Sequence, residues 1–196
     1  MSYPRSTERG TPTYRYWQLR EFASERSAFD DSLPEALKSF VGSGTRGQRV
    51  NTVRLNVDIL IHRPIQDVFS FLVHWENASL WNSAVRKVTK TSDGPVGVDT
   101  EYWMSRELPQ GPVENTFKVV EYEPNRRYSI QTTSGPTPFL YRYEFDQEGS
   151  DTRVSLSGEG KLGGIADMLS PIASIAVKRG VEANLHTLRD LLESRT

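Results

Sequence analysis

Residues 52–82, TVRLNVDILIHRPIQDVFSFLVHWENASLWN, form the segment that most constrains the fold of this chain. Between residues 53 and 61 every second side chain is apolar, which is the period of a strand buried on one face. Pro64 follows, and its fixed φ and missing N–H suit the start of a helix. Apolar residues then recur at helical spacing, at Ile65, Val68, Phe69 and Leu72. The segment therefore predicts a half-buried strand followed by a short helix that packs against a sheet.

Composition narrows the class of protein. A chain of 196 residues is long enough for one domain, or for one domain with an arm. Without cysteines there are no disulfides or thiolate metal sites, and the three histidines are scattered, so we expect no metal and no cofactor. The net charge of −1 gives nucleic-acid binding little electrostatic support. No apolar run suits a membrane-inserted helix or a signal peptide, so we expect a soluble, cytoplasmic protein.

Residues 1–50 differ from the rest of the chain and are predicted to form a partly helical N-terminal arm. They contain scattered aromatic residues and eight Lys and Arg against six Asp and Glu. Ser32 and Glu35 match a helix-capping box, and Gly42 is placed to end that helix. Residues 42–47, GSGTRG, are typical of a flexible joint. The domain itself is then expected to span residues 51–196.

After Asn82 the chain alternates strand-like runs with short turns rich in Gly, Pro, Asn and Asp. Short links of this kind favour an antiparallel meander. The six predicted strands are residues 84–91, 100–107, 113–122, 127–133, 139–146 and 152–161.

A long amphipathic helix is predicted for residues 165–194, with a kink at Pro171. Together with two short helices after the first strand, the element order predicts an α+β fold. In this fold a curved, seven-stranded antiparallel sheet wraps around the C-terminal helix. Such an arrangement often leaves a cavity between sheet and helix.

The order and spacing of several motifs resemble the START-like or Bet v 1-like helix-grip superfamily (SRPBCC), and most closely its polyketide cyclase/dehydrase branch. The resemblance covers residues 53–194 but not the first 50. It implies a hydrophobic cavity for a lipid-like, aromatic or polyketide molecule, and some relatives act as cyclases or aromatases. The matching pieces are Ile61-His62-Arg63-Pro64, Val68-Phe69, Phe71-Leu72, Trp81, Gly94-Pro95-Val96-Gly97-Val98, residues 119–128, and Thr152-Arg153-Val154 with the amphipathic tail.

Alternation along the strands suggests which side chains face this cavity. Tyr141 and Tyr143 share one strand face with Phe139 and Phe145, and their hydroxyls can orient a ligand or simply pack in the core. Tyr102 and Met104 are expected to point inward on another strand, unless a bulge reverses the faces. The residues expected to contact a ligand are Trp81, Tyr102, Met104, Phe117, Tyr128, Tyr141, Tyr143, Met168, Leu169 and Ile172.

Candidate catalytic residues are His74, Tyr141 and Tyr143. An imidazole or a phenol can move protons on an enolisable polyketone, although a lone histidine at a helix end more often makes a surface or capping bond. Glu114 and Arg142 are expected to lie in water, because an unpaired buried charge is expensive. The sequence contains no nucleophile triad, phosphate-binding loop or paired-carboxylate motif that stands out.

Three functions follow from these patterns. The first is binding of a small hydrophobic molecule between the sheet and the C-terminal helix. The second is cyclisation, aromatisation or dehydration of a polyketide-like substrate. The third is a protein-interaction module, in which residues 1–50 contact a partner or form a homodimer.

Overall fold

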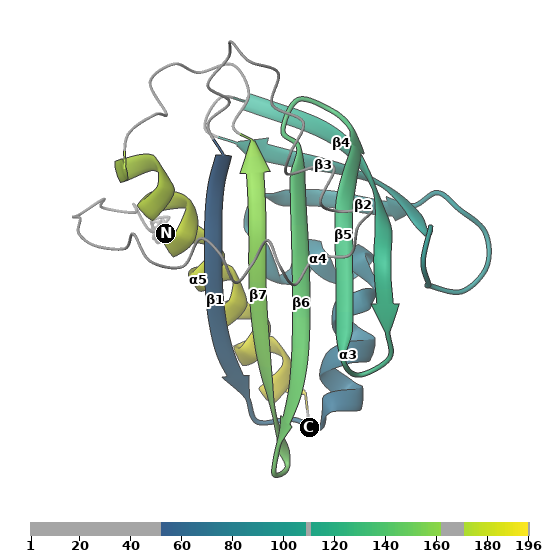
Figure 1. Cartoon of the computed structure of the whole chain (residues 1–196), viewed down its shortest axis with the longest axis vertical. Helices are drawn as coiled ribbons and strands as arrows, with labels where there is room; N and C mark the ends of the chain where they lie inside the picture. Colours follow the sequence, from purple (N-terminus) through teal and green to yellow (C-terminus); the bar gives the residue numbers. More distant parts are fainter. Residues whose placement is uncertain (1–51, 109–110, 162–170, 196) are drawn as a thin grey trace, which may run out of the picture.

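Seven strands form one antiparallel sheet in the order β1-β7-β6-β5-β4-β3-β2 in the computed structural model (Figure 1). The structure describes residues 52–108, 111–161 and 171–195. Hairpins join successive strands from β2 to β7, and the first strand pairs with the last. The strands are β1 (Thr52–Ile61), β2 (Val85–Lys90), β3 (Glu101–Leu108), β4 (Gly111–Glu123), β5 (Arg127–Ser134), β6 (Phe139–Glu148) and β7 (Asp151–Lys161).

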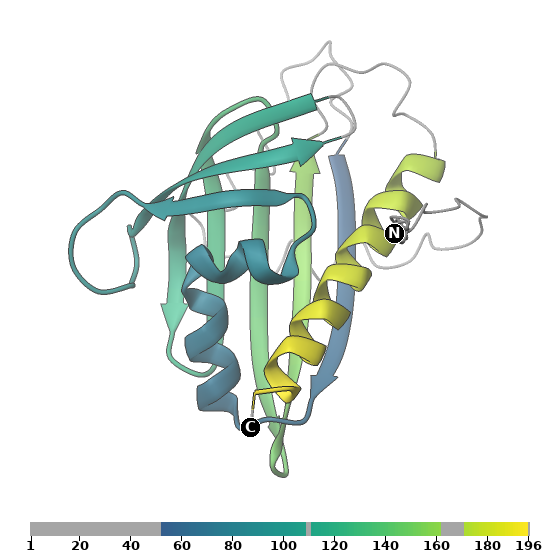
Figure 2. The ribbon, with the colours of Figure 1, turned by 180° about the vertical axis from the view of Figure 1, so that it is seen from behind.

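The helices of the described chain all lie on the concave face of this curved sheet (Figure 2). α5 runs along β1, and α3 packs against β6 and β7. The predicted helix-grip fold is therefore confirmed. The helical elements are α3 (Ile65–Val73), the 3₁₀ helix η1 (Trp75–Asn77), α4 (Ala78–Trp81) and α5 (Pro171–Glu193).

The predicted element boundaries agree with the structure to within about two residues where both can be compared. Pro64 precedes the first residue of α3 and occupies its N-cap position, with its carbonyl accepting the Val68 N–H at 3.2 Å. The described part of the C-terminal helix starts at Pro171, so the kink predicted there stays a prediction. Residues 1–50, with the predicted capped helix and the joint at 42–47, also lie outside the described residues.

Aromatic side chains join α3 and η1 to the concave face of the sheet. The Phe69 ring contacts the rings of Phe145 and Tyr122, with centroids 5.1 and 5.5 Å away. On β1 the predicted inward residues from Leu55 to Ile61 are buried, with Leu55 5% exposed and Ile61 fully covered. Burial of this aromatic surface is the main driving force for packing helices on the sheet.

A β-bulge in β4 changes which side chains face inward. The pairing of β4 with β5 shifts between Val119 and Glu121. Val119 and Tyr122 consequently both pack in the core, three positions apart, while Glu121 lies on the convex face. The inserted residue breaks the two-residue alternation on which the sequence prediction depended.

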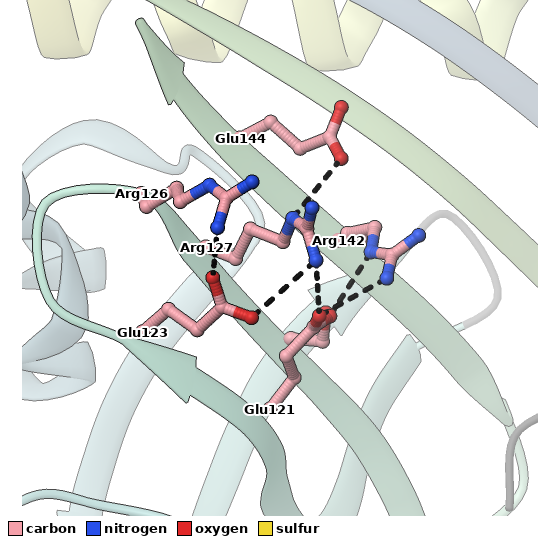
Figure 3. A network of polar contacts seen from close by, with 7 residues as sticks. Glu121, Glu123, Arg126, Arg127, Arg142 and Glu144 are labelled. Atoms are coloured by element: carbon pink, nitrogen blue, oxygen red, sulfur yellow. Dashed lines mark hydrogen bonds and ion pairs between the residues drawn. The ribbon is translucent and has the colours of Figure 1, made fainter. Parts of the chain in front are cut away.

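The expectation that Arg142 lies in water is wrong. Its side chain is only 4% exposed and forms a two-bond ion pair with Glu121, with Nε–Oε2 and Nη2–Oε1 distances of 3.0 Å (Figure 3). The bulge places Glu121 opposite Ser129, the neighbour of Arg142 across the strands, and this long-range pairing cannot be read from either residue's own strand. Glu114, by contrast, is exposed as expected.

None of the helices in the described ranges combines the length and apolar character needed to cross a membrane.

Candidate ligand-binding site

The concave face brings most of the predicted ligand-contacting residues into one region. Tyr102 stacks on Phe117 with ring centroids 5.1 Å apart, and both side chains are fully buried. Trp75 of η1 touches Phe117, Tyr143 and Trp81, so it links the strands to the short helices. The predicted residues that the structure buries on this face are Trp81, Tyr102, Met104, Phe117, Tyr128 and Tyr143, with Tyr141 partly buried against them.

The wall predicted on the C-terminal helix is not described to the same extent. Met168 and Leu169 lie outside the described residues. Ile172 belongs to the first turn of α5, where only the backbone is described. The part of α5 that does pack in the core contributes Leu185, Leu188 and Leu192.

Two tyrosine hydroxyls converge on one backbone carbonyl at the end of α3. The hydroxyls of Tyr102 and Tyr128 donate to the Val73 oxygen at 3.4 and 3.3 Å. Carbonyls in the last turn of a helix lack an intrahelical partner, so these donors satisfy a group that would otherwise be buried alone. Burial raises the pKa of both phenols above the ordinary value. These two tyrosines therefore tie the sheet to α3 and remain protonated.

The Tyr141 ring lies against a glycine on the neighbouring strand, where no side chain obstructs it. Gly158 pairs with Tyr141, and a Cβ at Gly158 would lie only 2.5 Å from the Tyr141 Cδ1 atom. The Tyr141 ring also stacks on Phe139, with centroids 5.0 Å apart. Burial raises the pKa of Tyr141 and of Tyr143, although the nearby Arg106 charge opposes the rise at Tyr141. Both phenols are thus hydrogen-bond donors at neutral pH.

Arg106 is a polar residue of this site to which the sequence analysis assigned no role. Its Nη2 donates to Asn115 Oδ1 at 2.7 Å and to Thr137 Oγ1, and its guanidinium lies 5.5 Å from the centre of the Phe139 ring. Burial lowers its pKa, and the proximity of Tyr141 raises it in part. No carboxylate among the described residues pairs with Arg106, which carries a positive charge at any physiological pH.

Two buried nitrogens of this region have no hydrogen-bond partner among the described residues. They are Arg106 Nε and the indole Nε1 of Trp75, whose side chain is 3% exposed overall. The sequence analysis also missed Trp75 as a site residue, because it considered only the neighbouring His74 as a chemical group at that turn. Native proteins satisfy most buried donors, so an unpaired donor requires an explanation.

His74 lies apart from this arrangement of donors. It follows the last residue of α3 and is the N-cap residue of η1, where its side chain makes no capping bond, and it is exposed to solvent. The structure thus brings Tyr141, Tyr143, Arg106 and Trp75 to the concave face, whereas the predicted proton-transfer histidine is on the surface.

The chemistry available on the concave face is an apolar, aromatic surface with several hydrogen-bond donors. Trp75 and Arg106 supply N–H groups, and Tyr141 and Tyr143 supply protonated phenols. A carbonyl, carboxylate or other oxygen acceptor on an otherwise hydrophobic molecule complements such a surface.

A family model described as "Polyketide cyclase / dehydrase and lipid transport" matches residues 52–193, and the chain belongs to this family. The match spans all seven strands and all of α5, which is the part of the chain that builds the concave face. No protein with a curated description matches the sequence.

Solved structures with the same fold are similar at low sequence identity. A protein from Thermus thermophilus has a TM-score of 0.61 at 17% identity, covering 71% of this chain and 96% of its own. The Zhui aromatase/cyclase from a Streptomyces species has a TM-score of 0.61 at 13% identity, covering 74% and 96%. A START superfamily protein from Mycobacterium smegmatis has a TM-score of 0.57 at 14% identity, covering 72% and 95%. At these identities the likeness concerns the fold.

Proposed function

We propose that this chain binds a small hydrophobic molecule, carrying at least one oxygen acceptor, between the concave face of the sheet and α5. The observation that carries the proposal is Arg106, a largely buried cation without a carboxylate partner in the described chain. Its Nε lacks a hydrogen-bond partner beside the phenol of Tyr141. A bound acceptor would satisfy this donor, and the aromatic residues around it would cover the apolar part of the ligand.

Two dyes with the same aromatic body test this proposal directly. 1-Anilinonaphthalene-8-sulfonate carries an anionic acceptor, and N-phenyl-1-naphthylamine lacks it. We expect the native chain to bind both, and Arg106→Met to weaken binding of the sulfonate about tenfold or more while binding of the neutral dye changes little. Fluorescence titration at fixed salt measures both dissociation constants.

Arg126→Met is the matched control, because Arg126 lies in the turn between β4 and β5 and its side chain is 67% exposed. This variant is expected to leave both dissociation constants unchanged. If the native chain binds neither dye, or if Arg106→Met and Arg126→Met behave alike, the proposal is wrong. Native mass spectrometry of the purified protein then identifies any molecule that it carries.

A second candidate function is a cyclase, aromatase or dehydratase that acts on a polyketide-like substrate. The family description and the aromatase/cyclase neighbour support it, as does the proximity of the Arg106 cation to the phenol of Tyr141. Because burial raises their pKa, Tyr141 and Tyr143 suit donation to a carbonyl oxygen better than removal of a proton. Holding the reactive chain in one orientation would supply the remainder of the rate enhancement.

Turnover of poly-β-ketone mimics tests this second function. We expect Tyr141→Phe or Tyr143→Phe to lower the rate by about 100-fold or more, the usual scale for a lost proton donor. His74→Ala is expected to leave it unchanged, because that ring is exposed to solvent. Equal rates in the native chain and both phenylalanine variants would contradict these roles, and a lower rate in His74→Ala alone would assign proton transfer to His74.

A further inference from the structure

The convex face of the sheet contains side chains that are unexpectedly buried. On β6, Leu140 is 1% and Arg142 4% exposed, and on β7 Glu159 is 3% exposed. Farther along the same face of β6, Glu144 and Asp146 are exposed, as expected for the outer side of a sheet. Burial on this face is thus confined to one end of the strands.

These buried side chains belong to two neighbouring rows that run across three strands. One row pairs Leu140 with Glu159 and Glu159 with Arg54, and the next pairs Arg142 with Ser157 and Ser157 with Asn56. We call these six residues the convex patch. The Arg54 guanidinium contacts the Glu159 carboxylate, and Arg54, Asn56 and Arg142 also make interactions besides the pairs named so far.

No described helix covers the convex patch. α3, α4 and α5 all lie on the other side of the sheet, as the two opposite views show (Figures 1 and 2). The open face of an antiparallel sheet is commonly solvated, yet Leu140 on this face is 1% exposed in the structure of this single chain. A segment of this chain outside the described ranges is therefore the candidate cover.

We propose that the segment of residues 1–51, which is the N-terminal arm (residues 1–50) with Asn51, docks on the convex patch. Its last residue precedes Thr52, two positions from Arg54 at the edge of the patch. Leu140 lies two strands away from β1, a lateral distance of about 10 Å that a segment of this length spans easily. The other two candidate segments fit less well, because residues 109–110 join β3 to β4 and residues 162–170 lead to α5 on the concave side.

The arm contains aromatic side chains, which suit a contact with the apolar part of the convex patch. Tyr14, Tyr16, Trp17 and Phe22 provide aromatic surface that gains by contact with Leu140. The same contact excludes water from the Arg142–Glu121 pair and from Glu159. The arm then covers the face of the sheet opposite the concave ligand site and leaves that site unobstructed.

A single spin label in the full chain tests this docking. The sequence contains no cysteine, so one introduced thiol carries the nitroxide at a defined place. Glu144→Cys sets the label beside the patch, at a side chain that is 47% exposed, and Leu80→Cys sets it on α4, at a residue that is 54% exposed. We expect the label at 144 to broaden a contiguous set of amide signals within residues 1–51, and the label at 80 to leave those signals unchanged.

Two results would overturn the docking. One is the absence of broadening in residues 1–51 with the label at 144. The other is broadening that appears only when isotope-labelled chains without nitroxide are mixed with spin-labelled chains, which would assign the cover to a second copy. Leu140→Ser adds an independent readout, since loss of the apolar anchor is expected to weaken the broadening while the circular dichroism spectrum stays the same.

Discussion

Arg142→Ala is expected to lower the free energy of unfolding by about 3–5 kcal/mol at neutral pH. The substitution leaves the Glu121 carboxylate, whose side chain is only 10% exposed, without its two-bond partner. The Ser129 hydroxyl at 2.7 Å and Arg127 Nη1 at 3.6 Å remain, but they do not replace a bidentate ion pair. Urea unfolding followed by circular dichroism measures the loss.

The same variant should show a characteristic pH dependence. In the native chain burial by itself raises the pKa of Glu121, but hydrogen bonds from Arg142 and Ser129 and the charges of Arg142 and Arg127 outweigh it, so the pKa lies below its ordinary value. Glu121 therefore stabilises the native chain above its unfolded pKa, and this contribution is lost as pH falls through the folded pKa. Without Arg142, burial dominates and the pKa should rise. The stability difference between the two proteins is then expected to shrink as pH is lowered from 7.

Arg126→Ala is the matched control for this prediction, because Arg126 pairs with Glu123 at 3.2 Å on the same network but is well exposed (Figure 3). We expect Arg126→Ala to lower the free energy of unfolding by at most about 1 kcal/mol. The double variant Arg142→Ala with Glu121→Ala should recover part of the lost unfolding free energy, because it removes the buried Glu121 carboxylate that has lost its partner. If the two single arginine variants lose the same free energy of unfolding, the buried pair stabilises the protein no more than the exposed pair does.

Phe117→Ala is expected to lower the free energy of unfolding by a similar amount, about 3–5 kcal/mol. The ring is fully buried, stacks on Tyr102, and contacts Trp75 and Phe139 with centroids 5.6 and 5.8 Å away. Its removal leaves a cavity among three aromatic rings that are themselves fixed by the sheet and η1. The loss should appear as a lower midpoint in urea and in thermal unfolding.

A graded series checks that packing is the cause. Phe117→Leu keeps most of the apolar volume, so its cost should be clearly smaller than that of Phe117→Ala. Leu80→Ala removes a large apolar side chain that is 54% exposed, and its effect should stay within about 0.5 kcal/mol. A Phe117→Ala cost no larger than that of Leu80→Ala would contradict the observed packing.

Much of the fold follows from local patterns in the sequence. The alternation in residues 53–61 predicted β1, and Pro64 with the apolar residues after it predicted α3, because the strand and helix periods are properties of neighbouring residues. Turn chemistry separated the remaining strands nearly where the structure has them. The inward positions of Tyr102, Met104, Tyr128 and Tyr143 followed from the same alternation.

The site and the convex face depended on contacts between residues far apart in the chain. Only the fold shows that the bulge at Val119 and Glu121 turns a carboxylate outward to meet Arg142, 21 residues later. The partners of Arg106 and the unpaired indole of Trp75 likewise arise from the packing of β3, β4, β6 and η1. By itself the sequence determined the strands, the helices and their apolar faces, because these depend on local periods. Tertiary structure alone decided which polar groups are buried and paired, because burial and register are set by segments distant in sequence.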